Sequence, residues 1–174
     1  MMTVALMGLR GSGKSTIGPA VAAELGLPFR DLDPLTLDAS GSSTAAEVVD
    51  AGGWTAFRAF ELEALSAVLS QGPCVLGLGG GTPTDDGCRR LIEASQQAGS
   101  LRLVYLRASP AVLGERIGPG DDRPSLTGID PKDEIEAVFA ERDPLYRSMA
   151  DAVVECDGLS IDEQAAAVIA ELGR

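Results

Sequence analysis

The stretch that decides the fold is MGLRGSGKST, residues 7–16, which follows a short apolar run. It contains Gly8-x-x-x-x-Gly13-Lys14-Ser15, the pattern of a P-loop. In such a loop, backbone N–H groups turn inward around phosphate oxygens, and the following helix adds the positive end of its dipole. The motif predicts a nucleotide site with Lys14 on the β- and γ-phosphates and the Ser15 hydroxyl on Mg²⁺.

Residues beyond the P-loop predict alternating strands and helices. The expected strands are short apolar runs at residues 3–8, 27–33, 73–81, 102–108 and 152–156. Longer amphipathic segments predict helices at residues 14–25, 54–69 and 161–172. Continuous apolar strands separated by helices indicate a parallel sheet covered on both faces. We therefore expect an α/β fold with three α/β/α layers and a five-stranded parallel sheet, in a single domain over residues 1–174.

The composition restricts the function. The chain has 26 acidic and 14 basic side chains, a net charge of -12, which argues against general affinity for nucleic acid or membranes. It has no histidine, so histidine-based catalysis and histidine-ligated metals are excluded. The three cysteines form no C-x-x-C pair, no targeting signal is visible, and no apolar run approaches the ~20 residues of a membrane span. We expect a soluble, cytoplasmic protein.

Two further unusual stretches stand at the carboxyl ends of expected strands, at the sheet edge where ligands of parallel sheets bind. They are Asp-Leu-Asp at residues 31–33 and three glycines at residues 79–81. One aspartate could hold Mg²⁺ through water while the other accepts the proton of an attacking hydroxyl, although a simple acidic turn has the same residues. The glycines let a ligand approach the backbone and offer N–H donors, although a tight turn also explains them.

Arginines offer the matching positive charge. Arg58 lies in the apolar face of the helix expected at residues 54–69, where it either pairs with Glu61 or holds an anion. Arg116 and Arg123 flank a glycine- and proline-rich segment that we interpret as a flap. Such a flap would exclude water from a triphosphate and bring charge to the transferred group. These features favour a small-molecule kinase, with ATP as donor because no N/T-K-x-D guanine motif occurs.

The chain resembles the shikimate kinases over nearly its whole length. The shared motifs are GLRGSGKSTIG at residues 8–18, DLD at 31–33, GGWTAFRAFELEAL at 52–65, LGGGTP at 78–83, DRPSLTG at 122–128 and ERDPLYRSMAD at 141–151. This ordered set is far more specific than the P-loop alone. The resemblance implies a P-loop kinase domain with a helical acceptor-binding subdomain at about residues 33–62 and a lid at about residues 114–128.

The resemblance also implies a role for each residue. The reaction would be ATP-dependent phosphorylation of the 3-hydroxyl of shikimate with Mg²⁺ as cofactor, in a monomer whose partners are these small molecules. Lys14, Asp33 and Arg123 would be catalytic, and Ser15 and Asp31 would hold the metal. The ATP-binding residues would be Gly11, Ser12, Gly13, Lys14, Ser15, Thr16, Arg116 and Arg123. The shikimate-binding residues would be Asp33, Arg58, Gly79, Gly80, Gly81 and Arg142.

Four positions depart from the family's usual pattern. Gly77 stands where a Ser or Thr bonds toward the Mg²⁺ shell, Trp54 replaces a Glu, Ala45 replaces a large apolar residue, and Ser125 interrupts R-P-L-L. None of them removes a charged residue assigned to chemistry. Two alternatives stay open from the sequence: a kinase for another acceptor, such as gluconate or a nucleoside monophosphate, and an ATP-binding regulatory protein that has lost catalysis.

Overall fold

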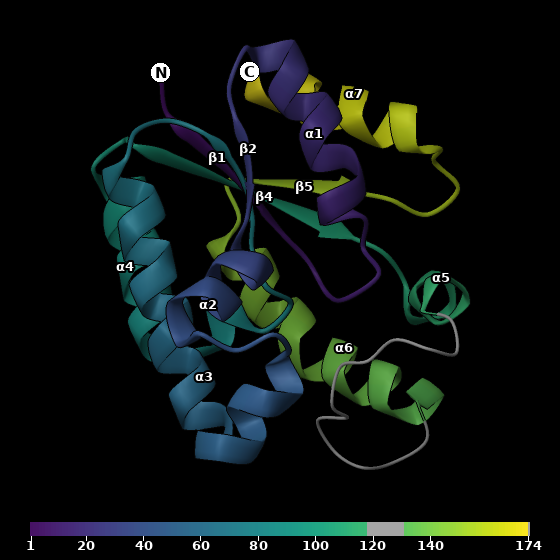
Figure 1. Cartoon of the computed structure of the whole chain (residues 1–174). Coiled ribbons are helices and arrows are strands. Elements are labelled where there is room, and N and C mark those ends of the chain that lie inside the picture. The colour runs from purple at the N-terminus through teal and green to yellow at the C-terminus, as the bar shows by residue number, and fades with distance from the viewer. Residues whose placement is uncertain (118–130, 174) are drawn as a thin grey trace.

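The fold is built around one parallel sheet (Figure 1). The computed structural model describes residues 1–117 and 131–173. Five strands follow in the order β2-β3-β1-β4-β5, and every neighbouring pair is parallel. The strands are β1 (Thr3–Met7), β2 (Phe29–Asp31), β3 (Val75–Gly77), β4 (Leu101–Arg107) and β5 (Ala152–Glu155).

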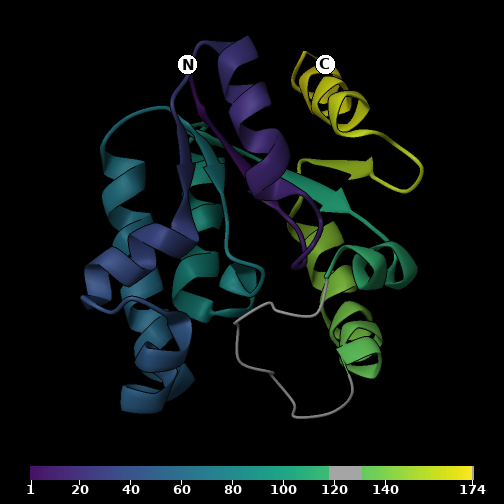
Figure 2. The same cartoon turned by 45° about the vertical axis from the view of Figure 1, so that its right-hand side comes forward.

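Helices cover both faces of the sheet. They are α1 (Lys14–Leu25), α2 (Leu32–Ser40), α3 (Ala45–Ser70), α4 (Asp86–Gln97), α5 (Pro110–Arg116), α6 (Pro131–Met149), α7 (Ile161–Leu172) and the short 3₁₀ helix η1 (Thr82–Thr84). Helices α1 and α7 pack together on one face, and α3, α4 and α6 lie on the other (Figures 1 and 2). The predicted three-layer α/β/α architecture with a five-stranded parallel sheet is confirmed.

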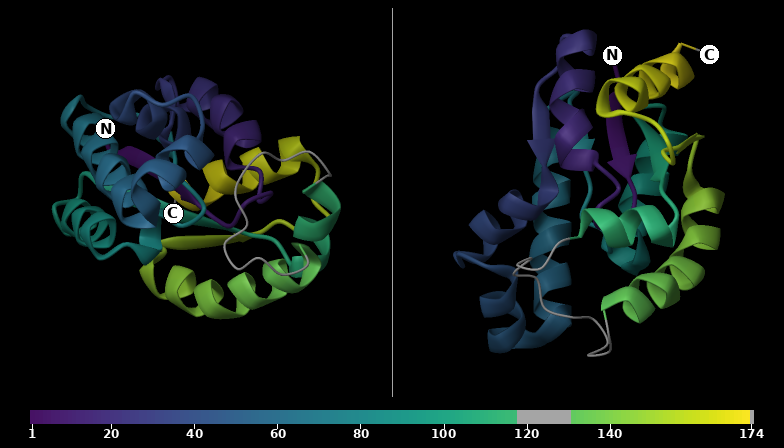
Figure 3. Two further views of the ribbon diagram at one scale, coloured as in Figure 1. Left: turned by 60° about the horizontal axis from the view of Figure 1, so that its bottom comes forward. Right: turned by 90° about the vertical axis from the view of Figure 1, so that its right-hand side faces the viewer.

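The strands form the core because helices exclude water from both of their faces. All five residues of β1 are buried, and the side chains of Leu6, Leu76 and Leu103 are fully buried. The register pairs Leu6 with Gly77 and Val104, and Asp31 with Gly77. The segments that follow β1, β2 and β3 therefore leave the sheet at one edge, with α2 and part of α3 beyond it (Figure 3).

The second strand is shorter than predicted and ends at Asp31. The Asp31 side chain accepts a hydrogen bond from the backbone N–H of Asp33 at 3.1 Å, and so caps the first turn of α2. Asp33 is thus the second residue of a helix and not the end of a strand. The prediction missed α2 because a carboxylate directly after an apolar run is equally typical of a turn.

Helix α3 begins before the predicted Trp54, at Ala45. The Thr44 hydroxyl accepts from the Glu47 N–H, and the Glu47 carboxylate accepts from the Ser43 N–H, so small polar residues start a helix here. Gly53, with φ 72° and ψ 179°, kinks it, and the predicted helix is its second half. Neither α3 nor any other helix of the described residues is long and apolar enough to cross a membrane.

Candidate active site

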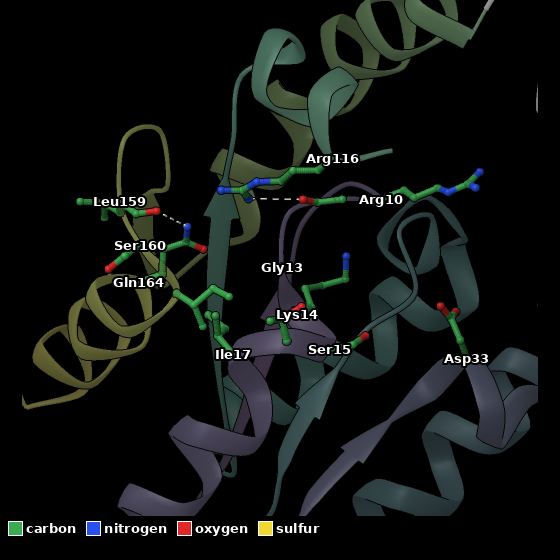
Figure 4. A pocket seen from close by; sticks show the side chains of 13 residues that line it. Arg10, Gly13, Lys14, Ser15, Ile17, Asp33, Arg116, Leu159, Ser160 and Gln164 are labelled. Carbon is green, nitrogen blue, oxygen red and sulfur yellow. Dashed lines mark hydrogen bonds between the residues drawn. The ribbon is translucent and has the colours of Figure 1, made fainter. Parts of the chain in front are cut away.

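The P-loop joins β1 to α1 and forms the floor of the site (Figure 4). Gly11 and Gly13 have φ values of 81° and 100°, a left-handed conformation that favours glycine and turns the loop back on itself. Gly13 immediately precedes α1, so the positive end of that helix faces the loop. The loop and the helix together form a cradle that suits a phosphate group.

Lys14 brings its charge into this cradle. Its side chain is 9% exposed, and the ammonium donates to the carbonyl oxygens of Gly8 at 2.8 Å and Leu9 at 3.0 Å. A third contact reaches the Ser12 hydroxyl at 3.4 Å. The lysine is therefore held by the loop's own backbone, which fixes a positive charge at the position where polyphosphate oxygens bind in such loops.

Two oxygen ligands meet beside the P-loop. The Ser15 hydroxyl donates to Asp31 Oδ2 at 2.5 Å, across from α1 to the end of β2. One hydroxyl and one carboxylate suit Mg²⁺, which is usually bound by one or two protein oxygens together with substrate phosphates and water. Among the residues that the structure describes, no group of three or more acidic, cysteine or histidine side chains is arranged so that it could hold a metal ion. The donor set thus fits a metal that arrives with a nucleotide.

A cavity of about 490 Å³ opens over the P-loop (Figure 4). Its walls include P-loop residues, Asp33, Arg116, and the stretch from Leu159 to Gln164, which covers the start of α7 and the two residues before it. Arg116 donates to the Gly11 carbonyl at 3.4 Å, and the Gln164 amide donates to the Leu159 carbonyl at 2.9 Å. The cavity therefore brings P-loop residues, among them the predicted metal ligand Ser15, together with Asp33 and Arg116.

The three glycines after β3 form a second centre next to this cavity. A Cβ atom added at Gly79 would lie 2.9 Å from Asp33 Oδ1 and 2.6 Å from Glu61 Oε1. One added at Gly81 would overlap the Arg58 guanidinium and lie 3.4 Å from Arg142 Nη1. Side chains from three helices thus converge on a backbone that has no side chains of its own.

Arg58 is held in this centre by Glu61. The two side chains form an ion pair, and Thr82 donates a second hydrogen bond to Glu61 at 2.6 Å. Glu61 is 1% exposed, and its burial raises the pKa of the carboxyl although Arg58 acts in the opposite direction. Of the two possibilities for Arg58, the pairing with Glu61 is confirmed. The Arg58 side chain remains 19% exposed, so part of it is accessible to a ligand.

Two aromatic rings flank the same arginine. The Arg58 Cζ atom lies 5.7 Å from the Trp54 ring centroid and 5.6 Å from that of Phe57. The two rings meet edge to face at 5.6 Å. These cation–π contacts restrict the guanidinium further and place Trp54, one of the departures from the family pattern, beside the predicted acceptor site.

Helix α6 supplies the opposite wall. Arg142 Nη1 donates to the Gly80 carbonyl at 3.1 Å, and the Tyr146 hydroxyl donates to the same oxygen at 2.5 Å. The buried Nε of Arg142 has no hydrogen-bond partner within residues 1–117 and 131–173. Arg142 from α6 and Arg58 from α3 therefore both reach the triple glycine.

The structure brings most of the predicted residues into two adjoining groups. P-loop residues, Asp31 and Arg116 belong to the first, and Arg58, the glycines and Arg142 belong to the second, with Asp33 shared between them. Arg123 lies outside the described residues, as does most of the predicted lid. Sequence reasoning missed Thr82, Tyr146 and Gln164, whose contacts are made to a buried carboxylate or to backbone carbonyls and leave no local pattern.

Comparisons with known proteins agree with this geometry. A family model described as shikimate kinase matches residues 10–173. The shikimate kinase of Ruegeria pomeroyi is 36% identical over 171 residues, which cover 98% of this chain and 84% of that protein. Shikimate kinase 2 of Yersinia pestis is 39% identical over 156 residues, 88% of this chain and 86% of that protein.

The chain belongs to the shikimate kinase family. Among solved structures, the shikimate kinase from Acinetobacter baumannii in complex with shikimate has a TM-score of 0.89 and 26% identity, covering 99% of this chain and 93% of that one. The predicted resemblance is thereby confirmed over nearly the full chain. Membership makes the protein a P-loop kinase, a transferase that uses ATP.

One departure from the family's pattern has a local explanation. A Cβ atom added at Gly77 would lie 3.5 Å from Phe29 Cζ, in ordinary van der Waals contact. The ring of Phe29 also packs against Gly18 of α1. The Phe29 ring thus covers the place that a side chain at position 77 would occupy. The Ser15–Asp31 hydrogen bond forms without a hydroxyl at that position.

Proposed function

We propose that this shikimate kinase family member transfers the γ-phosphoryl group of ATP to the 3-hydroxyl of shikimate, giving shikimate 3-phosphate and ADP. The observation that carries the proposal is the position of Asp33. Its carboxylate lies beside Gly79 in the arginine-lined centre and also lines the cavity over the P-loop. A group at the junction of a donor site and an anion site suits an acceptor that has both hydroxyls and a carboxylate.

The donor half consists of the P-loop and its neighbours. Backbone N–H groups of the loop and Lys14 would bind the phosphates, and Arg116 would line the nucleotide site. Ser15 and Asp31 would hold Mg²⁺ together with phosphate oxygens. When bound, the metal neutralises charge on the phosphates. Arg123 would add charge near the phosphates, a role that rests on the family resemblance.

The acceptor half would fix shikimate at both ends. Arg58 and Arg142 would bind its carboxylate, helped by N–H groups of Gly80 and Gly81, while Asp33 would accept hydrogen bonds from its hydroxyls. The attacking oxygen forms a bond to the γ-phosphorus, its proton passes to Asp33, and the bond from phosphorus to the β–γ bridging oxygen breaks to release ADP. Catalysis then consists chiefly of positioning and charge stabilisation.

Charge distribution supports an anionic acceptor. The chain carries a net charge of -12, yet Lys14, Arg58 and Arg142 gather around one edge of the sheet. A local positive site in an acidic protein attracts a small anion while the surrounding surface repels large polyanions. We also propose that the protein is a cytoplasmic monomer with Mg²⁺ as its cofactor; the three free, buried cysteines suit a reducing compartment.

The test is a coupled assay of ADP release with a panel of acceptors. We expect steady ADP release with ATP and Mg²⁺ only when shikimate is added, and not with gluconate or nucleoside monophosphates. Arg58→Ala should raise the KM for shikimate strongly and leave the KM for ATP unchanged. Arg89→Ala, which removes an arginine paired with Asp86 on α4, is the matched control and should change neither constant. ADP release without any acceptor would refute the proposal.

A further inference from the structure

Tyr146 is a buried residue to which the proposed reaction assigns no role. It lies on α6, one turn after Arg142, and its side chain is fully buried. Its hydroxyl donates to the Gly80 carbonyl oxygen at 2.5 Å, and Arg142 Nη1 donates to the same atom at 3.1 Å. Two side chains of one helix thus hold a single carbonyl of the triple-glycine loop.

That carbonyl belongs to the same peptide unit as the Gly81 N–H. Because the chain has no cis peptide bond among the described residues, the Gly80 C=O and the Gly81 N–H point in opposite directions. The carbonyl points toward α6, so the N–H points away from it. Neither the Gly80 nor the Gly81 N–H donates a hydrogen bond to any residue within 1–117 or 131–173. The N–H of Gly81 therefore points away from α6 and is available to a ligand.

We propose that Tyr146 is a positioning residue for the acceptor: by holding the Gly80 carbonyl, it aims the Gly81 N–H at the carboxylate of shikimate. Three successive glycines have wide conformational freedom, and no side chain of their own restrains this peptide. The P-loop backbone packs against Gly80 as well, since a Cβ atom added at Gly80 would lie 3.2 Å from the Arg10 backbone nitrogen. Tyr146 and Arg142 complete the restraint from the α6 side.

The Tyr146 hydroxyl is suited to act as a constant donor. Burial raises its pKa to about 12, so it stays protonated at neutral pH. Its ring meets that of Tyr105 edge to face, with centroids 5.5 Å apart, and the Tyr105 hydroxyl donates to Asp143 at 2.9 Å. Asp143 also pairs with Arg107 at 2.7 Å. The β4 strand thus fixes the part of α6 that carries both donors to Gly80.

The experiment compares Tyr146→Phe with Tyr105→Phe in the full chain. Both variants remove one hydroxyl from the same edge-to-face pair of rings, but only the first removes a hydrogen bond to Gly80. We expect Tyr146→Phe to raise the KM for shikimate roughly 3- to 10-fold, the effect of one neutral hydrogen bond, with kcat and the KM for ATP unchanged. In Tyr105→Phe the ion pair between Arg107 and Asp143 still ties α6 to β4, so this variant should lower the melting temperature without raising the KM for shikimate.

A second measurement uses the unaltered protein and does not depend on how the variants fold. In a ¹⁵N-labelled sample, addition of shikimate should shift the amide resonance of Gly81 strongly, and addition of ADP alone should not. An unmoved Gly81 resonance, an unchanged KM in Tyr146→Phe, or an equal rise in KM for both variants would overturn the inference.

The inference rests on the proposed function, but the two fail in different ways. If the unaltered enzyme shows no shikimate-dependent ADP release, the proposed function is wrong. If that activity is present and Tyr146→Phe has the kinetic constants of the unaltered enzyme, only the role of Tyr146 is wrong.

Discussion

Gly81→Ala is the substitution that most sharply tests how the acceptor site is built. Gly81 has φ -115° and ψ 0°, a conformation that alanine adopts without strain. The added methyl group would overlap Arg58 Nη2, so the guanidinium must retreat by about 1 Å to regain van der Waals distance. A displacement of that size in a positioning group costs about 100-fold in rate, or about 2.7 kcal/mol in transition-state stabilisation.

The assay is steady-state kinetics with shikimate as the varied substrate. We expect kcat/KM for shikimate to fall about 100-fold in Gly81→Ala, with the melting temperature preserved because the clash is with the end of a long side chain. Gly77→Ala is the matched control, since its methyl group would make an ordinary contact with Phe29 at 3.5 Å. Unchanged shikimate kinetics in Gly81→Ala, or an equal loss in Gly77→Ala, would refute the reasoning.

Three further predictions concern neighbouring groups. Trp54, the single tryptophan of the chain, lies 5.7 Å from Arg58 Cζ, so shikimate should change its fluorescence while ADP alone should not; an unresponsive emission would contradict the placement. Between pH 4.5 and the raised pKa of Glu61 in the folded protein, unfolding releases a proton from this carboxyl, so the free energy of unfolding falls as the pH rises. Glu61→Gln has no such group and should gain stability relative to the unaltered protein across this interval. Its KM for shikimate should rise. Denaturant unfolding of both proteins at several pH values tests this. A constant difference in the free energy of unfolding between the two proteins across the interval would contradict it. A chelator should abolish turnover, and Asp31→Asn should raise the Mg²⁺ concentration for half-maximal rate, which a Mg²⁺ titration measures; an unchanged midpoint would remove Asp31 from the metal site.

The sequence predicted the sheet well because its signal is local. Strands β1, β3, β4 and β5 lie in short apolar runs, and β1, β2 and β3 are each followed by a glycine-rich or acidic segment that the structure places at one edge of the sheet. Helix α1 has the predicted bounds, and so does α7, since a P-loop and a capping pair mark where they begin. Helix α2 and the first half of α3 were missed, because their starts depend on side-chain caps among small polar residues that are equally common in loops.

The two halves of the site differ in how many of their residues could be predicted from the sequence. The donor half is one continuous motif, so its residues could be assigned from their spacing. The acceptor half joins Asp33, Arg58, the triple glycine and Arg142, which are far apart in the chain and meet only because parallel strands end together. Arg142 could be assigned only through the family resemblance. Neither route gave Tyr146 a role, because its hydrogen-bond partner is a backbone carbonyl, which leaves no pattern in the sequence.

Identification of the phosphorylated product tests the central claim most directly. The enzyme would be incubated with ATP, Mg²⁺ and shikimate, and the product examined by ³¹P and ¹H NMR alongside a measurement of ADP. The account predicts one ADP for each shikimate consumed and a single phosphate ester on the 3-hydroxyl, identified by its coupling to the proton on C3. Phosphate on a different hydroxyl, or ADP formed without loss of shikimate, would contradict it.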